Sequence, residues 1–189
     1  MARLTALLGS PRKGGNTDTL LEKALDAARA SRVQVKKIVL NDLNIRPCQE
    51  CSGCREKGIC VIKDDMTVVY KALEEADSVL VASPIFFASV SAQTKTMIDR
   101  MQCFWVRKYV LHRQNTLKKR SGAFIACGGF KKESFFNCAE KVIDTFFKVQ
   151  DIDYIEGLFA GGVDSVGDML KQEKMLKKAY DLGKRLTES

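Results

Sequence analysis

Short apolar runs alternate along this chain with longer segments in which apolar residues recur at helical spacing. The short runs are predominantly apolar, which is typical of strands that helices cover on both faces. Five of these runs are predicted as strands: Leu4–Leu8, Val33–Leu40, Ser78–Ala82, Gly122–Cys127 and Tyr154–Ala160.

The intervening segments predict amphipathic helices. Two of them have clear bounds, Met66–Ala76, with Asp64 or Asp65 as its N-cap, and Ser91–Met101. Three others are marked by apolar residues on one helical face. These are Leu20, Leu21, Ala24, Leu25 and Ala28; then Phe135, Phe136, Ala139, Val142, Ile143, Phe146 and Phe147; and finally Met175, Ala179, Leu182 and Leu186.

This alternation predicts one α/β domain over residues 1–189, with a parallel sheet and helices on both of its faces. A cysteine-rich segment at about residues 46–63 is expected as a loop insertion. Ligands of such sheets bind at the carboxyl ends of the strands, near the point where the strand order reverses. The loops after the first, third and fourth strands are therefore the places to look for a site.

Composition narrows the chemistry. The chain has 189 residues, 46% hydrophobic and 29% charged, and no apolar run long enough to cross a membrane. Met1–Leu8 is too short for the apolar region of a signal peptide, so we expect a cytoplasmic protein. Thiols stay reduced there, and the seven cysteines then indicate metal or redox chemistry rather than disulfides.

The net charge of +8 is unevenly distributed, with nine Lys or Arg and no acid between Arg100 and Lys132. This stretch is interpreted either as a solvated loop or as a landing site for an anion. The anion could be a pyridine-nucleotide phosphate, an acidic electron-transfer partner or a nucleic acid. Because no nucleic-acid-binding motif is present, nucleic acid is not expected.

A polar, glycine-rich loop, Gly9–Thr17, separates the first strand from the first helix. It matches neither a Walker A loop nor Gly-x-Gly-x-x-Gly. Its position at a helix N-terminus nevertheless favours a phosphate, because unpaired N–H groups and the helix dipole attract anions. The candidate ligands are Ser10, Arg12, Asn16, Thr17 and Thr19. An ordinary capped helix start is the alternative.

Two aromatic residues, Phe86 and Phe87, follow the third strand in the segment Ser83–Val90. A flat apolar ligand such as an isoalloxazine ring would explain them, whereas packing under the next helix is the alternative. After the fourth strand, Gly128 and Gly129 allow close approach of the backbone to a ligand.

Four cysteines, Cys48, Cys51, Cys54 and Cys60, have the spacing C-x2-C-x2-C-x5-C. Bacterial ferredoxins use a related run for iron–sulfur clusters. Structural zinc sites usually pair two separated knuckles, and this gap is absent. An iron–sulfur cluster, zinc and free thiols remain the three hypotheses. The other cysteines, Cys103, Cys127 and Cys138, lack ligand spacing and are expected to pack in the core.

Together these motifs, in this order, resemble the NADPH-dependent FMN reductase family, and with the cysteines they resemble its iron–sulfur flavoprotein branch. The resemblance covers about residues 1–130. It rests on the glycine-rich loop, Lys63-Asp64-Asp65-Met66, Ala76-Asp77, Ser83-Pro84-Ile85-Phe86-Phe87 and the segment Lys95–Arg100. The pair Phe86-Phe87 departs from the commoner Tyr-Phe, so a ring hydroxyl is lost there.

This resemblance implies a flavodoxin-like three-layer fold with the strand order 2-1-3-4-5. It implies that the glycine-rich loop holds the phosphate of flavin mononucleotide (FMN), that Pro84, Ile85, Phe86 and Phe87 line the flavin ring, and that Gly128 and Gly129 close its far side. Members of the family are typically homodimers or homotetramers with the flavin near a subunit interface.

The expected function is FMN-dependent electron transfer, because a flavin accepts a hydride from NAD(P)H or single electrons from a cluster. With a 4Fe–4S cluster on the four cysteines, a ferredoxin-like partner would exchange electrons with the protein. Without a cluster, the chain would be an NAD(P)H:FMN or quinone reductase. A zinc-binding interaction module is the hypothesis from another class.

Overall fold

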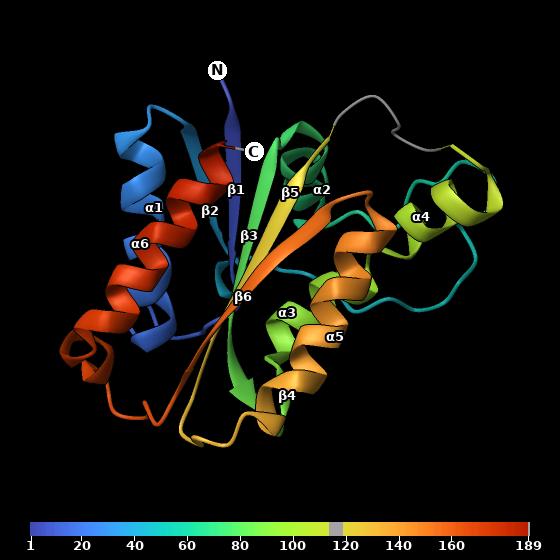
Figure 1. Ribbon diagram of the computed structural model, residues 1–189. Helices are drawn as coiled ribbons and strands as arrows, with labels where there is room; N and C mark the ends of the chain where they lie inside the picture. Colours follow the sequence, from blue (N-terminus) through green and yellow to red (C-terminus); the bar gives the residue numbers. More distant parts are fainter. Residues whose placement is uncertain (114–118, 189) are drawn as a thin grey trace.

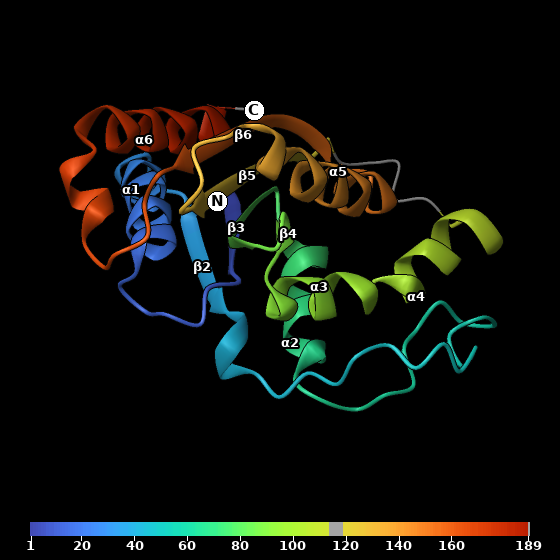
Figure 2. The same cartoon turned by 90° about the horizontal axis from the view of Figure 1, so that it is seen from below.

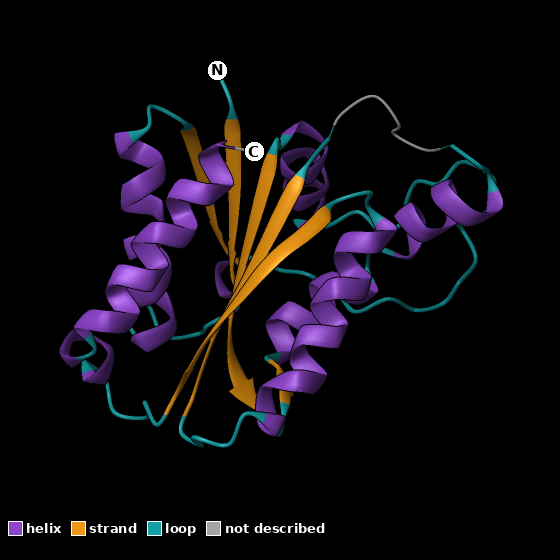
Figure 3. Cartoon of the chain, in the orientation of Figure 1, coloured by secondary structure: helices purple, strands orange, loops and turns teal. Residues whose placement is uncertain are grey.

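Five parallel strands form the centre of the computed structural model, in the order β2-β1-β3-β5-β6, and β4 pairs antiparallel with the end of β3. The structure describes residues 1–113 and 119–188. The strands are β1 (Arg3–Leu8), β2 (Gln34–Val39), β3 (Ser78–Phe86), β4 (Ser89–Val90), β5 (Ser121–Gly128) and β6 (Asp153–Gly161) (Figures 1 and 3). Counted along the parallel strands, this is the order 2-1-3-4-5, which confirms the predicted flavodoxin-like fold.

Helices cover both faces of this sheet, as Figure 2 shows. One face carries α1 (Asn16–Ala30) and α6 (Glu173–Glu188), and the other carries α2 (Met66–Glu75), α3 (Ala92–Asp99) and α5 (Ser134–Val149). A short helix α4 (Gln102–Trp105) and a π-helical turn (Val106–Val110) follow α3. Single 3₁₀ turns lie at Leu40–Asp42 and Asp168–Lys171.

Alternation along β1 divides the core into two layers, because successive side chains of a strand point to opposite faces. Leu4, Ala6 and Leu8 pack with the α1 and α6 side, whereas Leu7 packs with the α2 and α5 side. All four side chains are fully buried. Burial on both faces explains why the central strands β1, β3 and β5 are predominantly apolar, whereas the edge strand β2 carries lysines.

The third strand extends beyond its predicted end at Ala82 and continues to Phe86. Proline has no N–H to donate to a neighbouring strand, so Pro84 indicates the end of a strand. In the structure, however, Pro84 still lies in register with Cys127 of β5. Ile85 and Phe86 then pair with β4, so the predicted loop is a hairpin. The predicted helix Ser91–Met101 is also shorter, since α3 ends at Asp99.

None of the helices within residues 1–113 and 119–188 combines the length and the apolar composition that a membrane crossing requires.

Helices α1 and α6 approach each other so closely that only glycine fits at position 183. A Cβ there would lie 2.0 Å from the carbonyl oxygen of Ala24. Gly183→Ala should therefore destabilise the protein by about 1–3 kcal/mol, because overpacking against backbone outweighs the better helix propensity of alanine. Urea unfolding of the holoprotein measures this change.

The neighbouring substitution Lys184→Ala lies on an exposed position and serves as the control, with an expected change within about 0.5 kcal/mol. A Gly183→Ala variant more stable than the wild type would contradict this helix contact.

Candidate functional site

The loop after β1 is held between the end of β3 and the beginning of α3. The backbone N–H of Gly9 donates to the carbonyl of Ala82 at 2.7 Å, and the Ser91 hydroxyl donates to the carbonyl of Gly9 at 2.7 Å. A Cβ on Gly9 would lie 1.8 Å from the Thr94 hydroxyl oxygen, so this close approach requires glycine. The loop therefore enters α1 along a fixed path.

The N-terminus of α1 has the form of an anion site. Gly14 adopts a φ of 68°, and Gly15 occupies the cap position without a side chain to bond the first-turn N–H groups. Ser10 is buried, and its hydroxyl oxygen accepts the N–H of Arg12 at 3.2 Å. The Arg12 side chain is exposed beside this turn. Donors and positive charge thus gather at one helix end.

The Asn16 side chain is engaged elsewhere. Its amide nitrogen donates to the carbonyl of Ser165 at 2.9 Å, and its oxygen accepts the N–H of Met169 at 3.1 Å. It therefore ties the first turn of α1 to the segment that follows β6. Thr17 is buried against the Cys127 thiol, and Thr19 is half-buried.

Sequence reasoning missed an ion-paired carboxylate in the first turn of α1. Asp18 is buried; its carboxylate accepts the N–H of Gly14 at 2.9 Å and binds the Lys37 ammonium of β2 at 2.5 Å. Lys37 also binds Glu22 at 2.6 Å. Burial would lower the pKa of Lys37, but these two carboxylates raise it above its ordinary value. An acid in the first turn of a helix was the available signal.

The predicted ring-binding residues form an open apolar edge at the carboxyl ends of β3 and β5. Phe86 is half-exposed and Phe87 is fully exposed. Phe87 and Ala88 form the hairpin turn with φ of 49° and 59°, a left-handed backbone that usually selects glycine or asparagine. Such strained residues persist where the surroundings require them and cluster at functional sites.

The glycines after β5 lie across from this hairpin. A Cβ on Gly128 would lie 3.4 Å from the Cβ of Ile85, and one on Gly129 would lie 3.6 Å from the Asp164 side chain. The carbonyl of Gly128 accepts the N–H of Val163 at 3.1 Å. The next residue, Phe130, is exposed and stacks on Phe135 with ring centroids 4.7 Å apart. The structure thus brings the predicted ring-binding residues to one edge of the sheet.

The four spaced cysteines surround a single cavity of about 110 Å³ in the irregular segment between β2 and α2. Burial raises the pKa of the Cys54 thiol, and the proximity of the other three thiols raises it further. The backbone curls around Cys51, because Glu50 and Ser52 both adopt positive φ, 49° and 59°. The cavity is also lined by Arg100, Gln102, Cys103, Trp105 and Val106.

The geometry of these thiols bears on which metal they fit. A single zinc ion needs its thiolates about 2.3 Å from one point. Across residues 1–113 and 119–188, no group of three or more Cys, His, Asp or Glu side chains is arranged to hold a metal ion. Each cysteine of a 4Fe–4S cluster binds its own iron, so its thiolates stand around a cavity rather than on one ion. Four thiols around one cavity are the donor set that such a cluster requires.

Arg100 joins both ends of this cysteine loop to α3. Its side chain is fully buried and forms a two-pronged ion pair with Asp64, at 2.6 and 3.2 Å. It also donates to the carbonyls of Arg46, at 2.8 Å, and Ile62, at 3.3 Å, and to the Cys60 sulfur at 3.4 Å. Burial would raise the pKa of Asp64, but Arg100 and two backbone N–H groups lower it below its usual range.

Two family motifs without a predicted role thereby meet in space. Asp64 belongs to the segment before α2, where its carboxylate also accepts the N–H of Met66, and Asp65 occupies the predicted cap position without a side-chain cap. The spacing of 36 residues between Asp64 and Arg100 gave no local signal of this contact.

Several residues of the basic stretch between Arg100 and Lys132 bind other parts of the chain. Arg107 binds the carbonyl of Gly58, at 2.6 Å, and Glu74, and so holds the tip of the cysteine loop. Lys108 pairs with Asp151. Arg120 is buried and donates to the carbonyls of Leu73 and Gln150, at the C-terminal ends of α2 and α5. The prediction of a solvated or anion-binding stretch is therefore wrong for these residues and for Arg100; Lys118 lies outside the described residues.

The three remaining cysteines differ in their surroundings. Cys103 and Cys127 are buried, as expected, although Cys103 also lines the four-cysteine cavity. Cys138 on α5 is exposed, so the prediction of core packing is wrong there.

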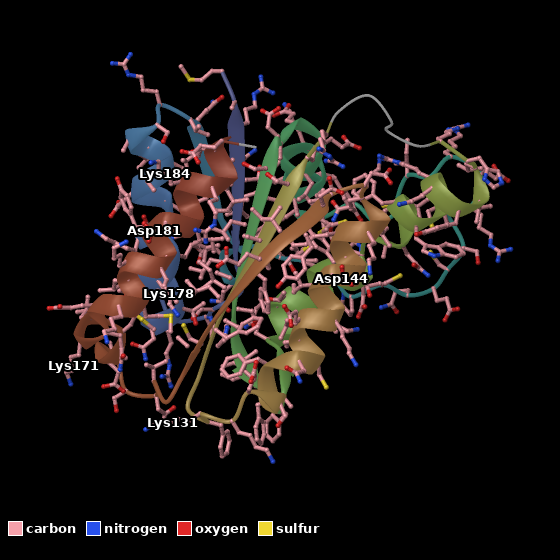
Figure 4. The ribbon with its side chains drawn as sticks, in the orientation of Figure 1. Lys131, Asp144, Lys171, Lys178, Asp181 and Lys184 are labelled. Carbon is pink, nitrogen blue, oxygen red and sulfur yellow. The ribbon has the colours of Figure 1, made fainter. Side chains whose placement is uncertain are left out.

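A separate cavity of about 470 Å³ opens along the edge strand β6. Lys131, Lys178 and Asp181, labelled in Figure 4, are among its lining residues. None of the predicted site residues lines it, so it is distinct from both candidate cofactor sites.

Comparisons with known proteins agree with this geometry. The profile of the NADPH-dependent FMN reductase family matches residues 2–156. An iron–sulfur flavoprotein of Archaeoglobus fulgidus is 33% identical over 99% of this chain and 80% of its own length. Iron–sulfur flavoprotein MJ1083 of Methanocaldococcus jannaschii is 30% identical over 98% of this chain and 96% of its own length.

Solved structures share the fold. An NAD(P)H:quinone oxidoreductase from Methanothermobacter marburgensis superimposes with a TM-score of 0.74 at 15% identity, covering 98% of this chain and 96% of that one. The parallel sheet, the polar loop after β1 and the aromatic edge define a flavodoxin-like flavin oxidoreductase. The chain belongs to the NADPH-dependent FMN reductase family, and it is accordingly an FMN-dependent oxidoreductase.

The Asp18–Lys37 ion pair leads to a prediction about the binding of the FMN phosphate. Without Lys37, the buried Asp18 carboxylate is left uncompensated beside the phosphate loop and repels a phosphate. Lys37→Met should raise the Kd for FMN about tenfold, which corresponds to about 1.4 kcal/mol. The Kd for riboflavin, which has no phosphate, should change much less. Fluorescence titration of the apoprotein measures both.

Lys36→Met is the matched control, because Lys36 is exposed on the opposite face of β2 and its loss changes the net charge equally. Equal weakening by the two variants, or equal weakening of FMN and riboflavin by Lys37→Met, would refute this role of the pair.

Proposed function

We propose that this chain transfers electrons between FMN and a 4Fe–4S cluster bound by Cys48, Cys51, Cys54 and Cys60. The observation that supports a cluster is that all four cysteines line one cavity. The relatives named iron–sulfur flavoproteins, which match most of this chain, support the same proposal.

In this proposal FMN lies at the carboxyl edge of the sheet. The loop after β1 binds its phosphate through Ser10, Arg12, Thr17 and Thr19 and through the backbone N–H of Asn16, whose side chain is occupied. Pro84, Ile85, Phe86 and Phe87 contact the flavin ring on one side, and Gly128 and Gly129 approach it on the other. When bound, FMN supplies hydride and single-electron chemistry.

The residues of this chain orient the flavin and do not act as acid or base. The hairpin of β3 and β4 presents an apolar surface that excludes water from the ring. NAD(P)H binding is implied by the family, and the nicotinamide would stack directly on the flavin. A ferredoxin-like protein is the proposed partner of the cluster.

The fully exposed ring of Phe87 supports a homo-oligomer. A large aromatic side chain on a strained turn is stabilised when another surface covers it. We therefore place a second copy of the chain, in a homodimer or homotetramer, against this hairpin. Seven free cysteines, two of them exposed, support a reducing, cytoplasmic location.

Cofactor analysis of protein purified without oxygen tests the proposal. The wild type should contain FMN, iron and acid-labile sulfide, with the iron and the sulfide in equal amounts. Cys60→Ser should lose most of the iron and sulfide, since serine is a poor ligand for the cluster. It should retain FMN, because none of the proposed flavin-binding residues lines the four-cysteine cavity. Flavin absorbance and chemical assays measure all three.

Cys138→Ser is the control, because Cys138 is exposed on α5 and lies outside the cavity. FMN without iron in the wild type would leave a plain NAD(P)H:FMN or quinone reductase. Stoichiometric zinc without flavin would favour the zinc-binding interaction module and would refute the proposed electron transfer between FMN and a cluster.

A further inference from the structure

Arg100 makes one contact that holding the loop does not require. Its carbonyl bonds and its ion pair with Asp64 join the loop ends to α3. The remaining bond runs from the guanidinium to the sulfur of Cys60, at 3.4 Å. Hydrogen bonds to ligand sulfurs and nearby charge are among the factors that set the reduction potential of an iron–sulfur cluster.

The surroundings of the Arg100 guanidinium strengthen its electrostatic effect on the Cys60 sulfur. The Arg100 side chain is completely buried, so water and salt do not screen its charge. Its backbone carbonyl accepts bonds from the Tyr70 hydroxyl, at 2.8 Å, and the Cys103 thiol, at 3.6 Å. The side chain also lines the four-cysteine cavity, and its Nε, also buried, has no hydrogen-bond partner within the described residues. Arg100 is therefore a fixed positive charge at the wall of the cluster site.

We infer that Arg100 raises the reduction potential of the cluster through its bond to Cys60, and that Asp64 limits this rise. The inference rests on the proposed function. Reduction adds one electron, supplied by the reduced flavin or by an external low-potential donor, and so adds one negative charge to the cluster. A cation at hydrogen-bond distance stabilises that charge, whereas the Asp64 carboxylate on the same guanidinium opposes it.

The two charges predict shifts of opposite sign. In Arg100→Gln the cluster should be harder to reduce, with the ratio of reduced to oxidised cluster at a fixed potential falling about tenfold, or about 59 mV for one electron. In Asp64→Asn the ratio should rise. Arg100→Lys keeps the positive charge and should lie nearer to the wild type than Arg100→Gln.

An anaerobic titration with dithionite, followed by the electron paramagnetic resonance of the reduced cluster, measures these ratios in the holoprotein. Arg55→Gln is the matched control: it removes an equal charge from the same loop, but Arg55 is exposed, and the ratio should change by less than about twofold. Iron and sulfide contents are determined on each sample.

A merely structural role gives a different result. If Arg100 only holds the loop, Arg100→Gln and Asp64→Asn should both lose iron or shift the potential in the same direction, and either outcome overturns the inference. An unchanged potential in a fully loaded Arg100→Gln also overturns it. Should Arg100→Gln alone fail to load, Asp64→Asn decides: a rise in its ratio of reduced to oxidised cluster supports the inference, and a fall or no change overturns it. A wild type without iron and sulfide rejects the proposed function itself.

Discussion

Because the five central strands run parallel, the chain must leave the sheet after β1, β3 and β5 at one common edge. At this edge the N-terminus of α1 offers free N–H groups, and the hairpin after β3 offers aromatic rings. The loops also bond to one another, through Gly9 and Ser91 and through Asn16 and Ser165. The candidate phosphate and ring subsites thus both follow from the parallel arrangement of the strands.

The cysteine loop has no such ladder to hold it. It lies beside α3 and α4 (Figure 2), and its position depends on side chains, mainly the buried Arg100–Asp64 pair at its ends and Arg107 at its tip. A buried ion pair is costly to desolvate and is stable only when its remaining donors and acceptors are bonded. Here Arg46, Ile62 and Met66 supply most of those bonds from the backbone. The same guanidinium that shapes the loop therefore also touches a thiol of the candidate cluster.

Much of this arrangement could be predicted from the sequence. The apolar runs located the parallel strands within a few residues, and the four spaced cysteines line one cavity. The hairpin at Phe87-Ala88 was missed because its turn lacks the usual glycine or asparagine. The contacts of Arg100 with Asp64 and of Asn16 with Ser165 join residues far apart in the chain, and no local periodicity encodes them. Asp18 was overlooked because its partner, Lys37, lies on the next strand.

We propose that flavin and cluster are redox partners within one chain. The number of electrons that the anaerobically purified wild type takes up from dithionite, normalised to its FMN content, tests this relation. We expect one electron more per chain than the flavin alone accepts, together with the paramagnetic signal of a reduced cluster. Uptake equal to that of the flavin, with no such signal, would refute the proposal.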